Sequence, residues 1–258
     1  MTDAYAPWAA WAASHALELF IALPLLAGAG AFFAVRAYAG CPARCRTVIH
    51  ASGLVVLLLL FLGLAMSVRR QGGIVAFDGA LAGALSMTMD TSLLWLLSWF
   101  TYLGDRDFLT VLSVLMTLYL LWTGWWRLAA FCAITTGVGG AINTLLKHTF
   151  ERARPEHDHG YAMVAGWSFP SGHASAAMVV YGTACYLVWR LAPPAWRWPC
   201  VALFAALIMA IGLSRILLQV HFASDVVAGF TFGLAWLSVC VAVAERYCTS
   251  RRAVQGAQ

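Results

Sequence analysis

Long apolar runs recur along almost the whole chain, separated by short segments that hold most of the charged residues. Each run has about the length, roughly 20 residues, that a helix needs to cross the hydrocarbon layer of a bilayer. The runs are rich in Leu, Ala and Val and lack the alternation of apolar and polar positions that marks a membrane β-strand. Seven such runs lie at residues 15–35, 48–68, 107–124, 128–146, 172–190, 198–217 and 224–245.

Composition supports this interpretation. Of the 258 residues, 62% are hydrophobic and only 10% are charged, whereas about a quarter of the residues of a soluble domain are charged. Backbone polar groups inside lipid must be satisfied within their own segment, so the runs are expected to be helices. The sequence therefore predicts an all-α protein, a polytopic membrane helical bundle of about six to seven transmembrane helices plus interfacial helices.

The chain is expected to form one structural domain, because it has no internal repeat, low-complexity tract or long linker. No Lys or Arg precedes the first run, so we expect that run to remain as an anchor rather than to be cleaved as a signal peptide. Asp78 and Asp90 would be costly to bury in lipid, which favours an interfacial position for the segment that holds them. The predicted parts are an N-terminal transmembrane hairpin (1–70), an outer interfacial segment (71–106), the main helical bundle (107–245) and a tail (246–258).

Three short strings follow one another in the second half of the chain. They read Lys147-x6-Arg154-Pro155, Pro170-Ser171-Gly172-His173, and Ser214-Arg215-x5-His221-x3-Asp225. Fixed Lys and Arg side chains stabilise the charge on the oxygens of a phosphoryl group, and the strings supply three such cations. Ser171 can cap a helix that begins there, and Gly172 lets an anion approach the free N–H groups of the first turn.

The strings also contain acid–base and nucleophilic groups. A neutral His221 can attack phosphorus, and Asp225, one helical turn later, can orient its ring. His173 can protonate the leaving oxygen. Each string alone has an ordinary interpretation, as cations that snorkel to the interface, a plain helix cap or a surface pair. Their occurrence in this order favours phosphoester hydrolysis, whereas for Arg106 and Arg152 we accept the snorkelling interpretation.

Together the strings resemble the signature of the type 2 phosphatidic acid phosphatases, the membrane lipid phosphate phosphatases of a superfamily that includes soluble acid phosphatases and vanadium haloperoxidases. The resemblance covers about residues 100 to 235 and implies that 107–245 is the catalytic bundle. It implies that His221 forms a phosphohistidine, that Asp225 orients it and that His173 is the general acid. It further implies that no metal or other cofactor takes part and that phosphate is bound by Lys147, Arg154, Ser171, Gly172 and Arg215.

Charge placement predicts the orientation. If the strings share one face, the opposite face carries Arg36, Arg44, Arg46, Arg127, Arg190, Arg197, Arg246, Arg251 and Arg252. By the positive-inside rule that face, with the tail 246–258, is cytoplasmic. One Lys against fifteen Arg, with abundant Ala, is typical of a GC-rich bacterial genome. We therefore predict a multi-pass protein of the bacterial inner membrane with its active site facing the periplasm, and no disulfide, because the cysteines fall in spans or on the cytoplasmic side.

The predicted function is metal-independent hydrolysis of a lipid phosphate or diphosphate. Undecaprenyl diphosphate, phosphatidylglycerol phosphate or phosphatidic acid, and lipid A all fit as substrates, and the expected partners are this lipid and the bilayer, without nucleic acid; the oligomeric state is left open. A lipid phosphotransferase using the same phosphohistidine is the main alternative. A transporter of phosphorylated compounds is disfavoured, because most spans lack charged residues and transport would not require two His and an Asp.

Two weaker patterns complete the sequence-based interpretation. Cys41-x3-Cys45 lacks a second pair of ligands, and the run Glu156-His157-Asp158-His159 is typical of a solvated loop, so we predict a metal at neither. Trp95, Trp99 and Trp167 are candidates to line a sideways exit for the lipid chain, although interfacial anchoring accounts for them equally well.

Overall fold

The computed structural model describes residues 5–156, 159–162 and 164–255. Regular structure within these ranges is helical throughout, with no strand. The elements are α1 (Ala6–Ser14), α2 (Ala16–Gly40), α3 (Ala43–Arg69), α4 (Gly73–Thr88), α5 (Thr91–Phe100), η1 (Thr101–Gly104), α6 (Arg106–Trp122), α7 (Trp126–Phe150), α8 (Gly172–Leu191), α9 (Pro194–Leu217) and α10 (Ala223–Gln255).

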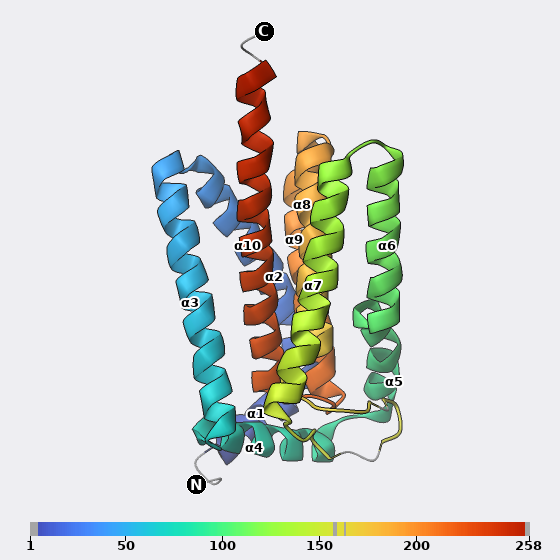
Figure 1. The fold of residues 1–258 in the computed structure, drawn as a ribbon. Helices are drawn as coiled ribbons and strands as arrows, with labels where there is room; N and C mark the ends of the chain where they lie inside the picture. Colours follow the sequence, from blue (N-terminus) through green and yellow to red (C-terminus); the bar gives the residue numbers. More distant parts are fainter. Residues whose placement is uncertain (1–4, 157–158, 163, 256–258) are drawn as a thin grey trace.

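The predicted membrane bundle is confirmed. Six of the described helices, α2, α3 and α7 to α10, are long and apolar enough to cross a bilayer. The remaining predicted run, 107–124, corresponds to α6. This helix has 17 residues, a length at the lower limit of about 17 for a span. Figure 1 shows α6 standing beside α7 in the same bundle.

The two helices of the predicted N-terminal hairpin cover different sides of the bundle. α2 packs along α9, whereas α3 packs along α10 (Figure 1). Both helices expose many apolar side chains, such as Leu25, Phe33 and Leu59. These surfaces are suited to contact lipid tails, so α2 and α3 form an outer layer beside the helices that hold the three strings.

The segment between α3 and α6 lies across one end of the bundle. Figure 1 shows α1 and α4 lying across the lower end of the bundle. The chain bends by 117° between α4 and the segment Thr91–Trp122, which contains α5 and α6. α1 was not predicted from the sequence; it packs on α4 through Ala9, Ala13, Leu81 and Leu85. The C-terminal end of α10, which continues past residue 245 to Gln255, lies at the opposite end.

Small residues let α8, α9 and α10 approach closely. A Cβ atom at Gly229 of α10 would lie 2.8 Å from the carbonyl oxygen of Ser171, at the start of α8. A Cβ atom at Gly212 of α9 would overlap the ring of Phe230 on α10. Because a real side chain at either position would force the helices apart, these glycines fix the spacing of the helices that carry the second and third strings.

Candidate active site

The three strings meet at the end of the bundle that α4 covers. Lys147 lies in the last turn of α7, and Arg154 lies in the loop that follows. Ser171 begins α8, while His221 lies in the turn between α9 and α10. Residues that are far apart in the sequence are therefore brought together by the ends of four adjacent helices.

His221 is held between a cation and a carboxylate. Its side chain is almost completely buried, with the residue 3% exposed. Nε2 lies 3.2 Å from Nη1 of Arg154, and Nδ1 lies 3.5 Å from Oδ2 of Asp225. A guanidinium group can only donate, so Nε2 is the nitrogen without a proton and Nδ1–H faces Asp225. The lone pair of Nε2 thus points toward the cations, as a nucleophile on a bound phosphate requires.

The charge state of His221 follows from its surroundings. Burial holds the pKa of His221 well below the usual 6.5, and the nearby charges of Arg154, Arg215 and Lys147 lower it further. Asp225 is itself fixed by the N–H of Phe222, which donates to Oδ2 at 3.0 Å. His221 is therefore neutral near pH 7 and faces, at 3.5 Å, a carboxylate whose orientation is fixed.

Two of the nitrogen donors of Arg215 have no acceptor among the described residues. The residue is only 2% exposed, and Nη1 donates to Oγ1 of Thr101 at 2.7 Å. Nε and Nη2 are buried without a hydrogen-bond partner among the described residues. A buried cation with unused donors is costly unless an anion fills the space, and the planar guanidinium fork fits two phosphate oxygens. Thr101, in η1, was not found from the sequence because nothing in its neighbourhood distinguishes it.

Arg154 and Lys147 hold the loop that precedes α8. Nζ of Lys147 donates to the carbonyl of Trp167 at 2.7 Å, and Nη2 of Arg154 donates to the same carbonyl at 3.1 Å. Nε of Arg154 donates to the carbonyl of Gly166 at 2.9 Å, and Nη1 to that of Val220 at 2.7 Å. These bonds fix both cations beside Nε2 of His221.

The start of α8 has the geometry that the second string predicts. Ser171 is the N-cap residue, and its Oγ accepts from the N–H of Ala174 at 3.4 Å. The N–H of Ser171 donates to the carbonyl of Asp225 at 3.0 Å, which joins the second string to the third. Gly172 faces Lys147, since a Cβ atom there would lie 3.6 Å from Cε of that lysine. Free N–H groups of this first turn can therefore face an anion next to the cations.

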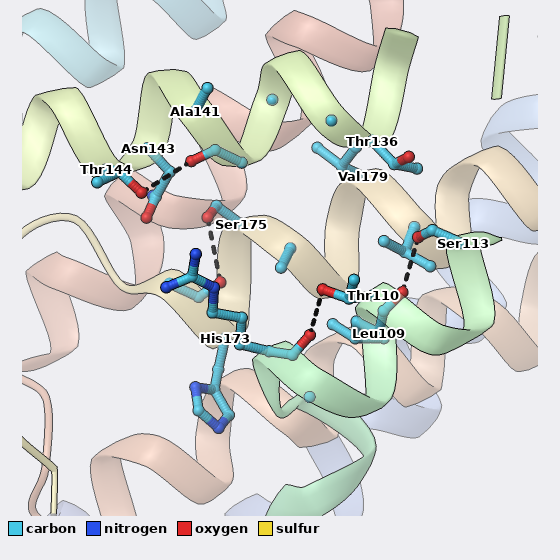
Figure 2. Close-up of a pocket in the computed structure, with 18 of the residues that line it drawn as sticks. Leu109, Thr110, Ser113, Thr136, Ala141, Asn143, Thr144, His173, Ser175 and Val179 are labelled. Atoms are coloured by element: carbon cyan, nitrogen blue, oxygen red, sulfur yellow. Dashed lines mark hydrogen bonds between the residues drawn. The ribbon is translucent and has the colours of Figure 1, made fainter. Parts of the chain in front are cut away.

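His173 lines a cavity of about 870 Å³ between α6, α7 and α8, and Figure 2 shows it with other residues of the lining. Its Nε2 atom lies 4.0 Å from Oδ2 of Asp105. Lys147 and Arg154 line the same cavity. His173 and two of the three cations therefore border a space large enough for a substrate.

The part of this cavity between α6 and α7 is apolar, although hydroxyl-bearing residues line it. Figure 2 shows Thr110 and Ser113 of α6 and Thr136 and Thr144 of α7 along it. Each hydroxyl donates to a carbonyl of its own helix, at distances between 2.7 and 3.1 Å. The walls thus present methyl and methylene groups, which suits a hydrocarbon chain.

One expectation from the sequence is wrong, and one pair of alternatives can be compared with the structure. Arg152 does not snorkel to the interface, because its guanidinium is buried between the carboxylates of Asp78 and Asp225. Trp167 lines the cavity, but Trp95 and Trp99 do not; both are exposed in the interfacial segment. A lipid chain in this cavity would leave between α6 and α7.

Of the run Glu156–His159, His157 and Asp158 lie outside the described residues. Nε2 of His159 lies 3.0 Å from the carbonyl oxygen of Leu218, and its Nδ1 accepts from the N–H of Tyr161 at 3.1 Å. In the described part of the chain, no group of three His, Cys, Asp or Glu residues is arranged to hold a metal ion. The described bonds of His159 tie the loop to the end of α9.

Comparison with known proteins identifies the family. Residues 128–247 match the model of the PAP2 superfamily. Phosphatidylglycerophosphatase B of Bacillus subtilis is 30% identical over 187 residues, which cover 70% of this chain and 89% of that protein. This chain belongs to the PAP2 superfamily. The resemblance seen in the three strings is thereby confirmed.

Other relatives agree with this assignment. Lipid A 1-phosphatases of Rhizobium johnstonii and Rhizobium etli are each 32% identical over 154 residues, 56% of this chain, and the match covers 57% and 60% of their lengths. The PAP2 chain thus spans less than two thirds of these two curated relatives. The crystal structure of a transmembrane PAP2 type phosphatidylglycerolphosphate phosphatase from Bacillus subtilis superposes with a TM-score of 0.68 at 28% identity, covering 75% of this chain and 96% of that one.

Proposed function

We propose that this PAP2 protein removes phosphate from an anionic membrane lipid through a phosphohistidine on Nε2 of His221. One observation carries the proposal. The unprotonated Nε2 of a buried, neutral His221 faces the cations, while Arg215 beside it keeps two buried donors without a partner among the described residues. A phosphoryl group bound there would meet a nucleophile and a fork of donors together.

The reaction would proceed in two displacements. In the first, the lone pair of Nε2 of His221 forms a bond to phosphorus, the bond from phosphorus to the lipid oxygen breaks, and His173 gives its proton to that oxygen. In the second, water attacks phosphorus while His173 accepts a proton, and the bond from phosphorus to Nε2 breaks. Asp225 keeps the proton on Nδ1 and stabilises the positive charge that the ring carries between the two steps.

The substrate class follows from the cavity and the relatives. The apolar walls between α6 and α7 suit an acyl or prenyl chain, and the named relatives act on lipid A and on phosphatidylglycerophosphate. We therefore retain undecaprenyl diphosphate, phosphatidylglycerol phosphate or phosphatidic acid, and lipid A as substrates. Because three cations already provide fixed positive charge at the phosphoryl group, the reaction is proposed to need no metal.

The site is proposed to face the periplasm of a bacterial inner membrane. Arg44 and Arg127 lie in first turns, and Arg190 in a last turn, at the helix ends opposite the site. An excess of Arg at one side supports a cytoplasmic position for that side.

Phosphate release tests the proposal directly. The purified full chain is assayed in detergent against phosphatidic acid, phosphatidylglycerol phosphate, undecaprenyl diphosphate and lipid A, with a chelator present. We expect inorganic phosphate from at least one lipid, and none from His221→Gln. Equal turnover by His221→Gln would refute the covalent mechanism. Lipid phosphate lost without a matching yield of inorganic phosphate would instead indicate transfer to a second lipid.

Cysteine labelling tests the orientation. In a background without the seven native cysteines, single cysteines replace the exposed Glu156, in the loop after α7, and the exposed Thr123, in the turn between α6 and α7. A membrane-impermeant reagent should label Glu156→Cys in intact spheroplasts and Thr123→Cys only after lysis. The reverse pattern would place the site in the cytoplasm.

A further inference from the structure

Asp78 is linked to the carboxylate of Asp225 through one side chain, that of Arg152. It lies outside the three strings and outside residues 128–247, which match the family model. It lies on α4 and is 2% exposed. Its Oδ2 lies 2.9 Å from Nη2 of Arg152, and Nη1 of Arg152 lies 2.6 Å from Oδ1 of Asp225. Asp78, Arg152, Asp225 and His221 therefore form a continuous chain of charged or titratable groups.

Other contacts fix Arg152 in this position. Its Nη1 also donates to Oγ of Ser224 at 2.8 Å, and its guanidinium carbon lies 4.2 Å from the centre of the Phe222 ring. The carbonyl of Arg152 accepts from the N–H of Ser168 at 2.8 Å. Ser224 in turn donates to Asp78 through its N–H, at 3.1 Å, and through its hydroxyl, in a short hydrogen bond. The guanidinium of Arg152 is thus fixed by hydrogen bonds to Ser224, Asp225 and Asp78.

Arg152 alone would weaken the catalytic carboxylate. Asp225 assists His221 by its negative charge, which stabilises positive charge on the ring. A guanidinium at 2.6 Å offsets that charge, so Asp225 and Arg152 together are close to neutral. Asp78, paired with the opposite side of the same guanidinium, adds a second negative charge. Burial raises the pKa of Asp78 from its ordinary value, while its bonds with Ser224 and Arg152 act in the opposite direction. With Asp78 and Asp225 both ionised, the group behind His221 has a net charge of −1 instead of zero.

We infer that Asp78 is a positioning residue for phosphoryl transfer: acting through Arg152, it preserves the negative charge of Asp225 behind His221. This inference rests on the proposed function and deepens it, since it assigns a role in catalysis to the interfacial helix α4. It also explains why an Asp within a largely apolar helix is enclosed by protein, where an ionisable side chain is expensive.

The expected effect on His221 has a definite sign. The titratable and charged groups that face it are Arg154 from the loop, Arg215 from α9, Lys147 from α7, His173 from α8 and Asp225 from α10, with Arg152 and Asp78 behind Asp225. Asp78→Asn removes one negative charge from this set. Protonated His221 is then less favoured, so its pKa falls and the acidic limb of kcat/KM moves to lower pH.

The test compares Asp78→Asn with a matched control, Asp90→Asn. Asp90 belongs to the same interfacial segment, is exposed and only caps α5 through the N–H of Ser92 at 3.0 Å, a role that Asn fills as well. We expect Asp78→Asn to lower kcat on the order of tenfold or more, the effect typical of removing a partner behind a ligating or reacting group. KM and the activity of Asp90→Asn should stay unchanged.

A third variant, Ser224→Ala, removes hydrogen bonds of the cluster but keeps both carboxylates and the guanidinium. If charge is the cause, Ser224→Ala lowers kcat less than Asp78→Asn and leaves the acidic limb in place. If the limb does not move in Asp78→Asn, or if Ser224→Ala reproduces its whole effect, the cluster only supports the fold and the inference is wrong.

A measurement independent of turnover separates this inference from the proposed function. In protein labelled with ¹⁵N-histidine and saturated with inorganic phosphate, the signal that disappears in His221→Gln reports the protonation of His221. The pH at the midpoint of this titration should be lower in Asp78→Asn than in the parent chain and unchanged in Asp90→Asn. An unchanged midpoint in Asp78→Asn overturns the inference even if lipid phosphate hydrolysis is observed, and a lowered midpoint supports it even if no lipid of the panel is hydrolysed.

Discussion

Replacing Arg215 with Lys should damage catalysis while keeping the charge. Nη1 of Arg215 donates to Thr101, whereas Nε and Nη2 have no partner among the described residues and could donate to phosphate oxygens. The single nitrogen of a lysine can replace at most one of the two phosphate contacts. A hydrogen bond between charged groups contributes about 1.5–3 kcal/mol. The loss of one such bond corresponds to a decrease of about 10- to 150-fold in kcat/KM.

Arg215→Ala extends the same argument to both contacts. It removes about 3–6 kcal/mol of transition-state stabilisation, which corresponds to a decrease of about 10²- to 10⁴-fold. Neither change should lower the melting temperature much, because Arg215 is a buried cation with two unused donors, and burying such a charge costs stability. The decrease should appear mainly in kcat if these contacts are stronger with the planar phosphoryl group in flight than with the bound ester, because only such contacts accelerate the chemical step.

The assay is phosphate release from a short-chain phosphatidic acid in mixed micelles, with melting followed in the same detergent. Arg70→Lys is the matched control, because Arg70 ends α3 at the same side of the bundle and is exposed. Rates for Arg215→Lys within twofold of the parent chain would show that Nε and Nη2 do not contact the transferring group. A parallel loss in Arg70→Lys would show that the assay responds to surface charge.

Further predictions concern the nucleophile, the cavity and the acid. Because burial and the neighbouring cations keep the pKa of His221 well below 6.5, the acidic limb of kcat/KM should lie below pH 6.5 in a pH–rate profile; a limb above that value would contradict the neutral nucleophile. Asp225→Asn should lower kcat on the order of 10⁴-fold, as removal of the orienting carboxylate does in related triads, measured with the purified variant. Gly140 lines the cavity and has open space at its Cβ position, so Gly140→Phe should lower turnover of long-chain lipids more than that of a water-soluble phosphate ester. The same change at Gly63, exposed on α3 with equally open space, should affect neither substrate. His173→Ala should remove the alkaline limb, which the pH profile of its residual activity would show; an intact bell-shaped profile would mean that another group is the acid.

The bundle could be predicted because it depends on local properties of the sequence, since each span is a run of apolar residues. The strings could be recognised because their His, Asp, Lys and Arg are residue types that phosphoryl transfer requires, and the roles of these residues are part of the proposed function. α1 escaped prediction because it is short and its N-cap residue, Tyr5, makes no side-chain cap. Its contacts with α4 are tertiary, so no local pattern indicated them.

Arg152 and Thr101 were missed for a different reason. The contact between Arg152 and Asp78 joins residues 74 positions apart, and that between Arg215 and Thr101 joins residues 114 positions apart. A helix-end arginine is ordinarily an interfacial cation, and only the fold shows that this one is enclosed. The sequence did contain a sign in Asp78, an acid in an apolar stretch, which we attributed to an interfacial helix rather than to a buried partner.

The charges of the site are divided into two sides by the ring of His221. Arg154 lies in front of Nε2, and the charges of Lys147 and Arg215 also act on the ring. Nε and Nη2 of Arg215 have no partner among the described residues, so a phosphoryl dianion would offset this excess of positive charge. Behind Nδ1 lies the carboxylate of Asp225, linked through Arg152 to α4. The cations in front favour the neutral ring that attacks, whereas the negative side favours the charged ring that the attack produces. The three strings supply the front and only Asp225 of the back, so in the proposed mechanism phosphoryl transfer depends on the interfacial helix being folded against the bundle.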